Sequence, residues 1–183
     1  LVMRRWVDHI VFVADVMRKS YAETLPELTD RLVTISKGIP PLGPRLTKEM
    51  ARRALGLPLE VPLLGNVSRL VSQKRVSRLM EAQVFLPENA RLAIAGDGPL
   101  RGALGQKARA LRIRDRVHFL GHQQNIAPLL DAVDALVITS NREGMSSAML
   151  EAMARGVPVI STDVSGAREA LEPDAEGRAP GLV

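Results

Sequence analysis

Short apolar segments that alternate with longer amphipathic segments are the feature that most limits how this chain can fold. The short segments lie at 61–67, 91–95, 116–120, 135–139 and 157–161. Their aliphatic composition is typical of strands that are buried on both faces. The segments between them carry apolar residues at helical spacing, at 73–85, 100–111, 124–133 and 146–155. Because strands that alternate with helices are joined by parallel crossovers, we expect an α/β fold built on a doubly wound parallel sheet.

The amino-terminal part of the chain follows a different pattern. Strand-like segments at 8–13 and 31–35 enclose a helix-like segment at 14–24, and a loop rich in Gly and Pro follows at 37–44. We expect a domain seam within 13–34. Because the sequence begins with Leu1 rather than Met, we also expect it to be a piece of a longer protein.

The composition excludes several kinds of chemistry. Cysteine is absent, so disulfides, thiolate zinc sites and cysteine nucleophiles are excluded. No apolar run approaches the roughly 18 residues of a membrane span. The net charge of +5 favours anionic partners, such as nucleoside diphosphates or lipid head groups, although a solvated basic surface is an equal alternative. We expect no nucleic-acid partner, because no basic segment is interleaved with aromatic residues.

A glycine-rich turn follows the segment 91–95. Gly96 and Gly98, with Pro99 behind them, join a predicted strand to a predicted helix. Such a turn lets a ligand approach the backbone and reach the amino terminus of the helix. A dinucleotide site is one interpretation, but the acidic residue expected about 20 positions later is missing. The other interpretation is a tight structural turn.

Two carboxylates, Glu143 and Glu151, frame the start of the predicted helix 146–155. Glu143 falls in the preceding loop and Glu151 on the helix. Free backbone N–H groups at a helix start form an anion site. The residues that would provide them are Gly144, Met145, Ser146 and Ser147. A carboxylate accepts hydrogen bonds from sugar hydroxyls, so the pair could hold a hexose and a ribose. The alternative is a capping acid and a surface charge.

Two cations, Arg69 and Lys74, follow the segment 61–67. Together they could neutralise a diphosphate, Arg69 through its bidentate fork and Lys74 as a point charge. Taken alone, they are better explained as solvated surface charges.

In their order along the chain these motifs are more specific than any of them alone. The segments 68–74, 91–99, 116–121, 140–144 and 150–160 resemble the C-terminal domain of glycosyltransferase family 4, the retaining group 1 enzymes of the GT-B fold. The resemblance covers about 34–183 and implies a Rossmann-like, nucleotide-sugar-binding domain that is truncated at its carboxyl end. It implies that residues 1–33 are a remnant of the N-terminal domain and the hinge.

The resemblance also implies roles for individual residues. Arg69 and Lys74 match the pair that binds the donor diphosphate, and with Glu143, which matches the carboxylate facing the transferred sugar, they are our candidate catalytic residues. Glu151 matches the carboxylate that holds the ribose hydroxyls. The candidate substrate-binding residues are Gly96, Gly98, Gly144, Met145, Ser146, Ser147 and Glu151. The sequence departs from the family pattern at Lys37, Pro40, Ser68, Arg75, Ser146 and Ser147.

The implied reaction is retaining transfer of a hexose from a nucleotide diphosphate sugar, with a UDP-sugar favoured over a GDP- or ADP-sugar. No cofactor and no metal ion are implied. The expected partners are the chain's own N-terminal domain and a membrane surface or lipid-linked acceptor, in a cytoplasmic protein peripheral to the inner membrane that serves cell envelope polysaccharide biosynthesis. A nucleotide-sugar epimerase or phosphorylase of similar fold and a non-catalytic nucleotide-binding module remain alternatives.

Overall fold

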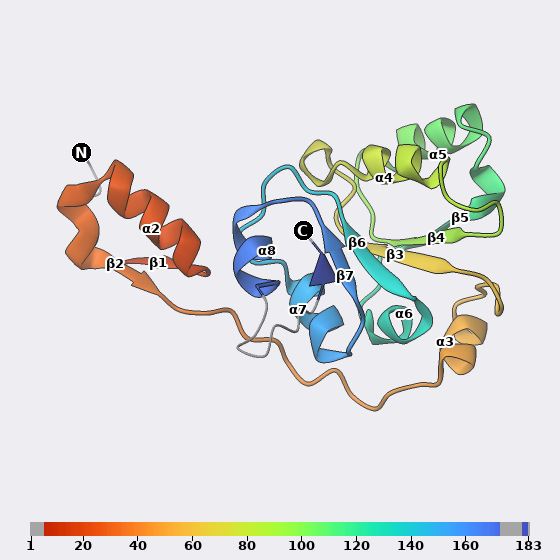
Figure 1. Cartoon of the computed structure of the whole chain (residues 1–183), viewed down its shortest axis with the longest axis horizontal. Helices are drawn as coiled ribbons and strands as arrows, with labels where there is room; N and C mark the ends of the chain where they lie inside the picture. The colour runs from red at the N-terminus through yellow and green to blue at the C-terminus, as the bar shows by residue number, and fades with distance from the viewer. Residues whose placement is uncertain (1–5, 173–180, 183) are drawn as a thin grey trace.

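A parallel sheet forms the centre of the computed structural model, which describes residues 6–172 and 181–182 (Figure 1). Its strand order is β5-β4-β3-β6-β7-β8, and every pair of neighbours is parallel. The strands are β3 (Leu63–Val67), β4 (Arg91–Ala95), β5 (Val117–Gly121), β6 (Ala135–Ile138), β7 (Val159–Ser161) and β8 (Gly181–Leu182). The predicted fold class, a doubly wound parallel α/β sheet, is confirmed.

Helices cover both faces of this sheet. They are α3 (Lys48–Ala54), α4 (Val76–Gln83), α5 (Arg101–Ala110), α6 (Ala127–Ala132), α7 (Ser147–Ala154) and α8 (Ser165–Ala170). Helices α4 and α5 pack over one face, and α3, α6, α7 and α8 pack over the other (Figure 1). Along the parts of the chain described above, no helix has the length and apolar character needed to cross a membrane.

Strand β4 shows why the strand segments of the main sheet are apolar at successive positions and do not alternate between apolar and polar residues. Leu92 and Ile94 belong to the core under α4 and α5, whereas Ala93 and Ala95 belong to the core on the opposite face. Because alternate side chains of a strand point to opposite faces, a strand covered on both faces must be apolar at every position. All four residues are at most 1% exposed.

The amino-terminal residues form a small unit beside the main sheet (Figure 1). Strands β1 (Ile10–Phe12) and β2 (Leu32–Thr34) make a two-stranded parallel sheet, and α2 (Asp15–Thr24) and a 3-10 helix (Pro26–Arg31) lie between them in the chain. This unit has its own core cluster. Its helix α2 packs against α8 of the main domain, where the Val16 N–H donates to Glu169 Oε2 at 2.9 Å.

The linker, residues 35–47, joins the small unit to α3 and runs past α7. Its second half is fixed by Arg155, which is 5% exposed. One Arg155 nitrogen donates to both carboxylate oxygens of Asp131 at 3.1 Å, and the other donates to the carbonyls of Leu42 at 2.5 Å and Gly43 at 3.1 Å. The Leu46 N–H donates to the same aspartate at 2.9 Å.

The helix expected at 73–85 is shorter than predicted. Residues Ser72–Lys74 form a 3-10 turn, Arg75 takes a left-handed conformation with φ 47°, and α4 then covers only Val76–Gln83. A side chain at a positive φ is strained, so a helix cannot continue through this position. The left-handed backbone also gives a reason why glycine is usual at the position of Arg75.

Candidate functional site

The order of strands reverses between β3 and β6, and the loops that follow these two strands lead to helices on opposite faces of the sheet. Such a reversal point marks a crevice at the carboxyl edge of the sheet. Two hydrogen bonds hold the loops together. Thr139 Oγ1 donates to the Lys74 carbonyl at 2.9 Å, and the Asn141 N–H donates to the Gln73 carbonyl at 2.8 Å. Residues far apart in the sequence are thereby brought to one edge.

Lys74 and Glu143 form an ion pair across this crevice. Lys74 Nζ donates to the two carboxylate oxygens of Glu143 at 2.7 Å and 2.5 Å, and Ser140 Oγ donates to one of them at 2.7 Å. The side chains of Lys74 and Glu143 are only 17% and 16% exposed. Burial weakens screening by water, so this pair is held more firmly than a surface pair would be.

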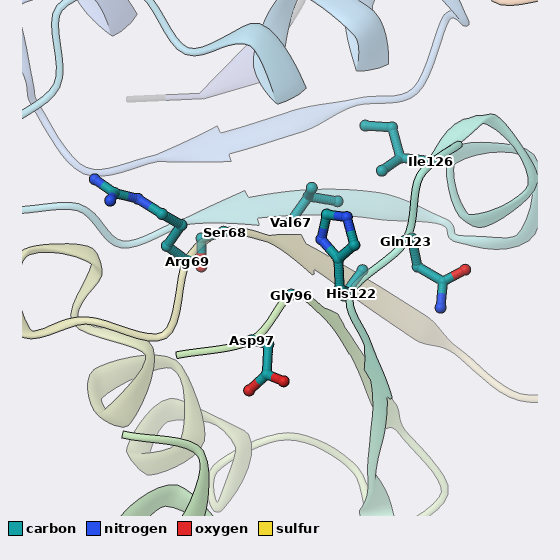
Figure 2. A pocket seen from close by; sticks show the side chains of 9 residues that line it. Val67, Ser68, Arg69, Gly96, Asp97, His122, Gln123 and Ile126 are labelled. Atoms are coloured by element: carbon teal, nitrogen blue, oxygen red, sulfur yellow. The ribbon is translucent and has the colours of Figure 1, made fainter. Parts of the chain in front are cut away.

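Arg69 is placed differently. Its side chain is exposed, and within the described part of the chain no hydrogen bond or ion pair engages it. In Figure 2 its guanidinium extends away from His122, on the other side of Gly96. The structure therefore leaves one cation paired at the crevice and one cation available beside it.

The start of α7 lies directly after Glu143. Ser146 is the N-cap residue, and its Oγ accepts a hydrogen bond from the Met149 N–H at 3.4 Å. In the described residues no hydrogen bond uses the N–H groups of Gly144, Met145, Ser146 or Ser147. These groups and the positive end of the helix dipole together favour an anion.

Gly144 is enclosed by packing on two sides. A Cβ at Gly144 would lie 3.1 Å from Met17 Sδ and 3.3 Å from Val13 Cγ2 of the small unit. A Cβ at Gly166 would lie 1.5 Å from the Gly144 carbonyl oxygen. A hollow of about 440 Å³ beside this loop is bordered by Met17 and Glu143. The small unit therefore forms part of the wall next to the carboxylate.

The glycine-rich turn after β4 packs against the loop after β3. A Cβ at Gly96 would lie 1.9 Å from the Ser68 carbonyl oxygen, and one at Gly98 would lie 2.7 Å from the Leu70 carbonyl oxygen. At both positions, the space that a side chain would occupy is filled by the backbone of the neighbouring loop. Close packing of the two loops is therefore a sufficient reason for both glycines. Ligand binding at Gly96 and Gly98 stays a prediction.

Gly96 also borders a hollow of about 460 Å³ at the ends of β3, β4 and β5, whereas Gly98 is not among the residues that line it. Figure 2 shows His122, Gln123 and Ile126, which follow β5, on one side of this hollow. The lining is mostly apolar, which suits a flat organic ring more than a phosphate.

Glu151 borders a further hollow, of about 400 Å³, which shares Ile126 with the first. Burial raises the pKa of the Glu151 carboxyl above its usual range, and the positive charge of Lys37 opposes this effect. Lys37 Nζ also donates to Ser147 Oγ at 2.5 Å, on the first turn of α7. The structure therefore brings Arg69, Lys74, Glu143 and Glu151 to one edge of the sheet.

Sequence reasoning missed three participants at this edge. Ser140 lies inside a segment that carried the resemblance, but only the fold shows that it holds Glu143. Ile126 is an ordinary apolar residue whose position between two hollows has no signal in the sequence. Lys37 could have been singled out from the sequence, because it is a departure from the family pattern. In the described regions, no cluster of three or more His, Asp and Glu side chains could hold a metal ion.

Comparison with known proteins adds a further observation. The family model described as glycosyl transferases group 1 matches residues 47–179. The chain is 35% identical over 123 residues to N-acetyl-alpha-D-glucosaminyl L-malate synthase of Bacillus anthracis, covering 66% of the chain and 32% of that protein. It is 36% identical over 115 residues to the lipopolysaccharide core biosynthesis glycosyltransferase LpsE of Rhizobium meliloti (strain 1021), covering 63% of the chain and 34% of that protein.

Solved structures share the fold. WaaG, a glycosyltransferase involved in lipopolysaccharide biosynthesis, matches with a TM-score of 0.78 and 25% identity, over 87% of the chain and 45% of that protein. Anabaena Alr3699/HepE in complex with UDP-glucose matches with a TM-score of 0.86 and 22% identity, over 100% of the chain and 51% of that protein. The chain thus spans about a third of the length of the two curated relatives and about half of these two solved structures.

Proposed function

The chain belongs to the glycosyl transferases group 1 family, and on that premise we propose that it is the donor-binding part of a retaining hexosyltransferase of glycosyltransferase family 4. The observation that carries the proposal is the meeting of Arg69, Lys74, Glu143 and the free N–H groups of α7 at the reversal point of the sheet. Open α/β sheets bind their ligands at this point.

The donor diphosphate would lie between the cations and the helix start. Arg69 and the N–H groups before α7 would bind its oxygens, and Lys74, which stays paired with Glu143, would donate the remaining N–H of its ammonium group. In glycosyl transfer the diphosphate leaves with growing negative charge, so these fixed dipoles and cations would stabilise the transition state more than the bound donor.

Glu143 would orient the transferred hexose. Lys74 and Ser140 fix its carboxylate, which leaves its remaining lone pairs for sugar hydroxyls. We assign no protein nucleophile, and Glu143 acts by positioning the anomeric carbon toward the acceptor.

The nucleoside would occupy the two hollows that share Ile126, with the base beside His122 and the ribose hydroxyls at Glu151. The HepE structure holds UDP-glucose, which supports a UDP-sugar as the preferred donor of this chain. GDP and ADP are the alternatives that the binding experiment below distinguishes.

The acceptor side of the site would come from the protein's own N-terminal domain. Val11 and Val33 lie opposite each other in the small sheet and are 54% and 36% exposed. A two-stranded sheet with an apolar open face is marginally stable alone, so further strands or helices would complete it. We propose that residues 1–33 belong to that domain and the hinge. Cytoplasmic location and peripheral attachment to the inner membrane stay predictions.

Calorimetric titration of this chain with UDP, GDP, ADP and NAD tests the proposal. We expect one nucleoside diphosphate to bind, and Arg69→Ala and Glu151→Ala each to weaken its binding by about tenfold or more. Arg109→Ala is the matched control, because Arg109 is an exposed arginine in the last turn of α5, at the opposite edge of the sheet.

Two results would contradict the proposal. One is a well-folded chain that binds no nucleoside diphosphate, or that binds NAD in preference. The other is rapid multiple-turnover sugar transfer by the chain alone, since the acceptor side is proposed to lie in the N-terminal domain.

A further inference from the structure

The linker lies along α7 and touches both of its ends. Near its beginning, Lys37 donates to Ser147 Oγ on the first turn of the helix at 2.5 Å. Further along, Arg45 donates to the Ala154 carbonyl at the last turn at 3.3 Å. The linker is therefore more than a connection between two units, because it covers the helix that carries Glu151.

The linker also forms a wall of the proposed ribose site. Residues Pro40, Pro41, Leu42 and Gly43 border the hollow of about 400 Å³ that contains Glu151. Ser147 and Glu151 are one turn apart on α7, so they share a helix face. Lys37 reaches this same face, and its charge acts on the Glu151 carboxylate.

The charge balance gives Lys37 a defined role. Lys74 and Glu143 neutralise each other in their ion pair. Asp163, which borders the hollow beside Glu143, is likewise paired with Arg168. Without Lys37, the other charged side chains that border the three hollows would be two cations, Arg69 and Arg142, and two carboxylates, Asp97 and Glu151, with no net attraction for an anion. With Lys37, three cations face two carboxylates, and the edge becomes positive. A charge at this edge matters because a nucleoside diphosphate is multiply anionic.

We propose that Lys37 is a donor-binding residue: its ammonium group, held at the first turn of α7, contacts the diphosphate of the donor, so that the linker supplies part of the site. This inference rests on the proposed function, and it adds a residue from outside the sheet to that site. Ser147 Oγ holds the ammonium beside the free N–H groups of residues 144–147.

Binding of UDP and of uridine to the 183-residue chain and its Lys37→Met variant tests this. We expect Lys37→Met to weaken UDP binding about tenfold and to leave uridine binding unchanged, because a lost charge-assisted contact affects only the ligand that carries phosphate. Lys37→Arg keeps the charge and should stay within about threefold of the unchanged chain for UDP.

Lys48→Met is the matched control. It removes a lysine that pairs with Asp134, before β6, at the opposite edge of the sheet. Lys37 is exposed, so its replacement should not unfold the chain, and a thermal melt checks this.

The outcomes separate the two proposals. If the unchanged chain binds no nucleoside diphosphate, the proposed function fails. If it binds UDP and Lys37→Met binds UDP equally well, the inference about Lys37 is wrong and the function stands. An equal loss for UDP and uridine also overturns the inference, because Lys37 would then act on the nucleoside site and not on the diphosphate.

Discussion

At the scale of single residues, the charges at the carboxyl edge of the sheet differ in how strongly they are held. Lys74 and Glu143 are mostly buried and fixed by several hydrogen bonds, whereas Arg69 and Lys37 are exposed. A fixed pair preserves geometry, and exposed cations can follow a ligand as it enters. Both properties suit the proposed site, which would position a sugar and bind a diphosphate.

Glu151 should make nucleotide binding depend on pH. Burial raises the pKa of its carboxyl, so the neutral form persists to a higher pH than in an unfolded chain. Its contribution to stability is therefore present at acid pH and is lost as pH rises through the raised pKa. Nucleotide binding should have the opposite trend, because the ribose hydroxyls of the proposed site would donate to the ionised form of Glu151. We expect UDP affinity to rise with pH through this pKa, as calorimetry across the acid range would measure.

The terminal phosphate of UDP also titrates, near about pH 6, so a control is needed. Glu151→Gln removes the carboxyl and keeps the shape, and only the phosphate step should remain. If the unchanged chain and Glu151→Gln have parallel pH profiles, Glu151 does not hold the ribose in its ionised form.

At the scale of elements, the site depends on two loops that interlock. The Leu70 N–H donates to the Asp97 carbonyl at 2.9 Å, and the Leu100 N–H donates to the Leu70 carbonyl at 3.1 Å. Gly96, with φ 135°, lets the two backbones meet. The position of Arg69 thus depends on a turn that belongs to a different strand.

Gly96→Ala should therefore destabilise the chain strongly. The new Cβ would combine a clash at 1.9 Å with a backbone conformation that side chains rarely adopt. We expect a loss of about 3 kcal/mol or more in the free energy of unfolding, measured in urea. Gly102→Ala is the control, because nothing lies within 4 Å of a Cβ there and Gly102 is helical. It should stabilise by about 0.5–1 kcal/mol. Equal effects of the two substitutions would refute this account.

The elements that sequence reasoning found and missed differ in a physical way. Strands such as β4 are apolar throughout because both faces are covered, and this signal is local. Helix α3 was missed because its buried side includes Arg52, which is 2% exposed and donates to the Ala132 carbonyl at 2.9 Å. A buried arginine interrupts the helical spacing of apolar residues by which a buried helix face is recognised in a sequence. Helix α8 is six residues long and buries only Gly166 and Ala167, so it carries too little pattern.

The site was predictable to a similar extent. The order of the motifs and their resemblance to glycosyltransferase family 4 indicated Arg69, Lys74, Glu143 and Glu151 as candidates, whereas each motif alone was also explained by surface charges or helix capping. The pairing of Lys74 with Glu143 was not predictable, since it depends on β3 and β6 being neighbours in the sheet. Contacts made across a crossover have no trace in local spacing.

At the scale of the whole molecule, a buried ion pair fixes the linker to the main domain. The side chains of Arg155 and Asp131 are 3% and 7% exposed, and carbonyl groups of the linker accept from the same arginine. Removing one partner leaves a buried charge without compensation. The link between the small unit and the sheet is therefore part of the folded core.

Arg155→Leu should lower the free energy of unfolding, measured in urea, by about 3–5 kcal/mol. Hydrogen exchange at the Leu46 N–H, which donates to Asp131, should also become faster. Adding Asp131→Leu to the variant should recover part of the stability, because no charge is then left buried. Arg168→Leu removes an exposed pair with Asp163 and should change nothing measurable. A negligible effect of Arg155→Leu would show that the linker is not fixed in this way.

The hydrogen bonds from Arg155 to the carbonyls of Leu42 and Gly43 limit which part of the linker can act as a hinge between the small unit and the sheet. Any change of angle between the small unit and the sheet must be absorbed by residues 35–41, before the clamped carbonyls. Lys37 lies in that stretch, so rotation of the small unit moves its ammonium relative to Ser147. Linkage is reciprocal: a ligand that retains Lys37 favours one orientation, and that orientation raises affinity by the same factor. If the donor contacts Lys37 as proposed, the linker couples donor binding to the orientation of the small unit.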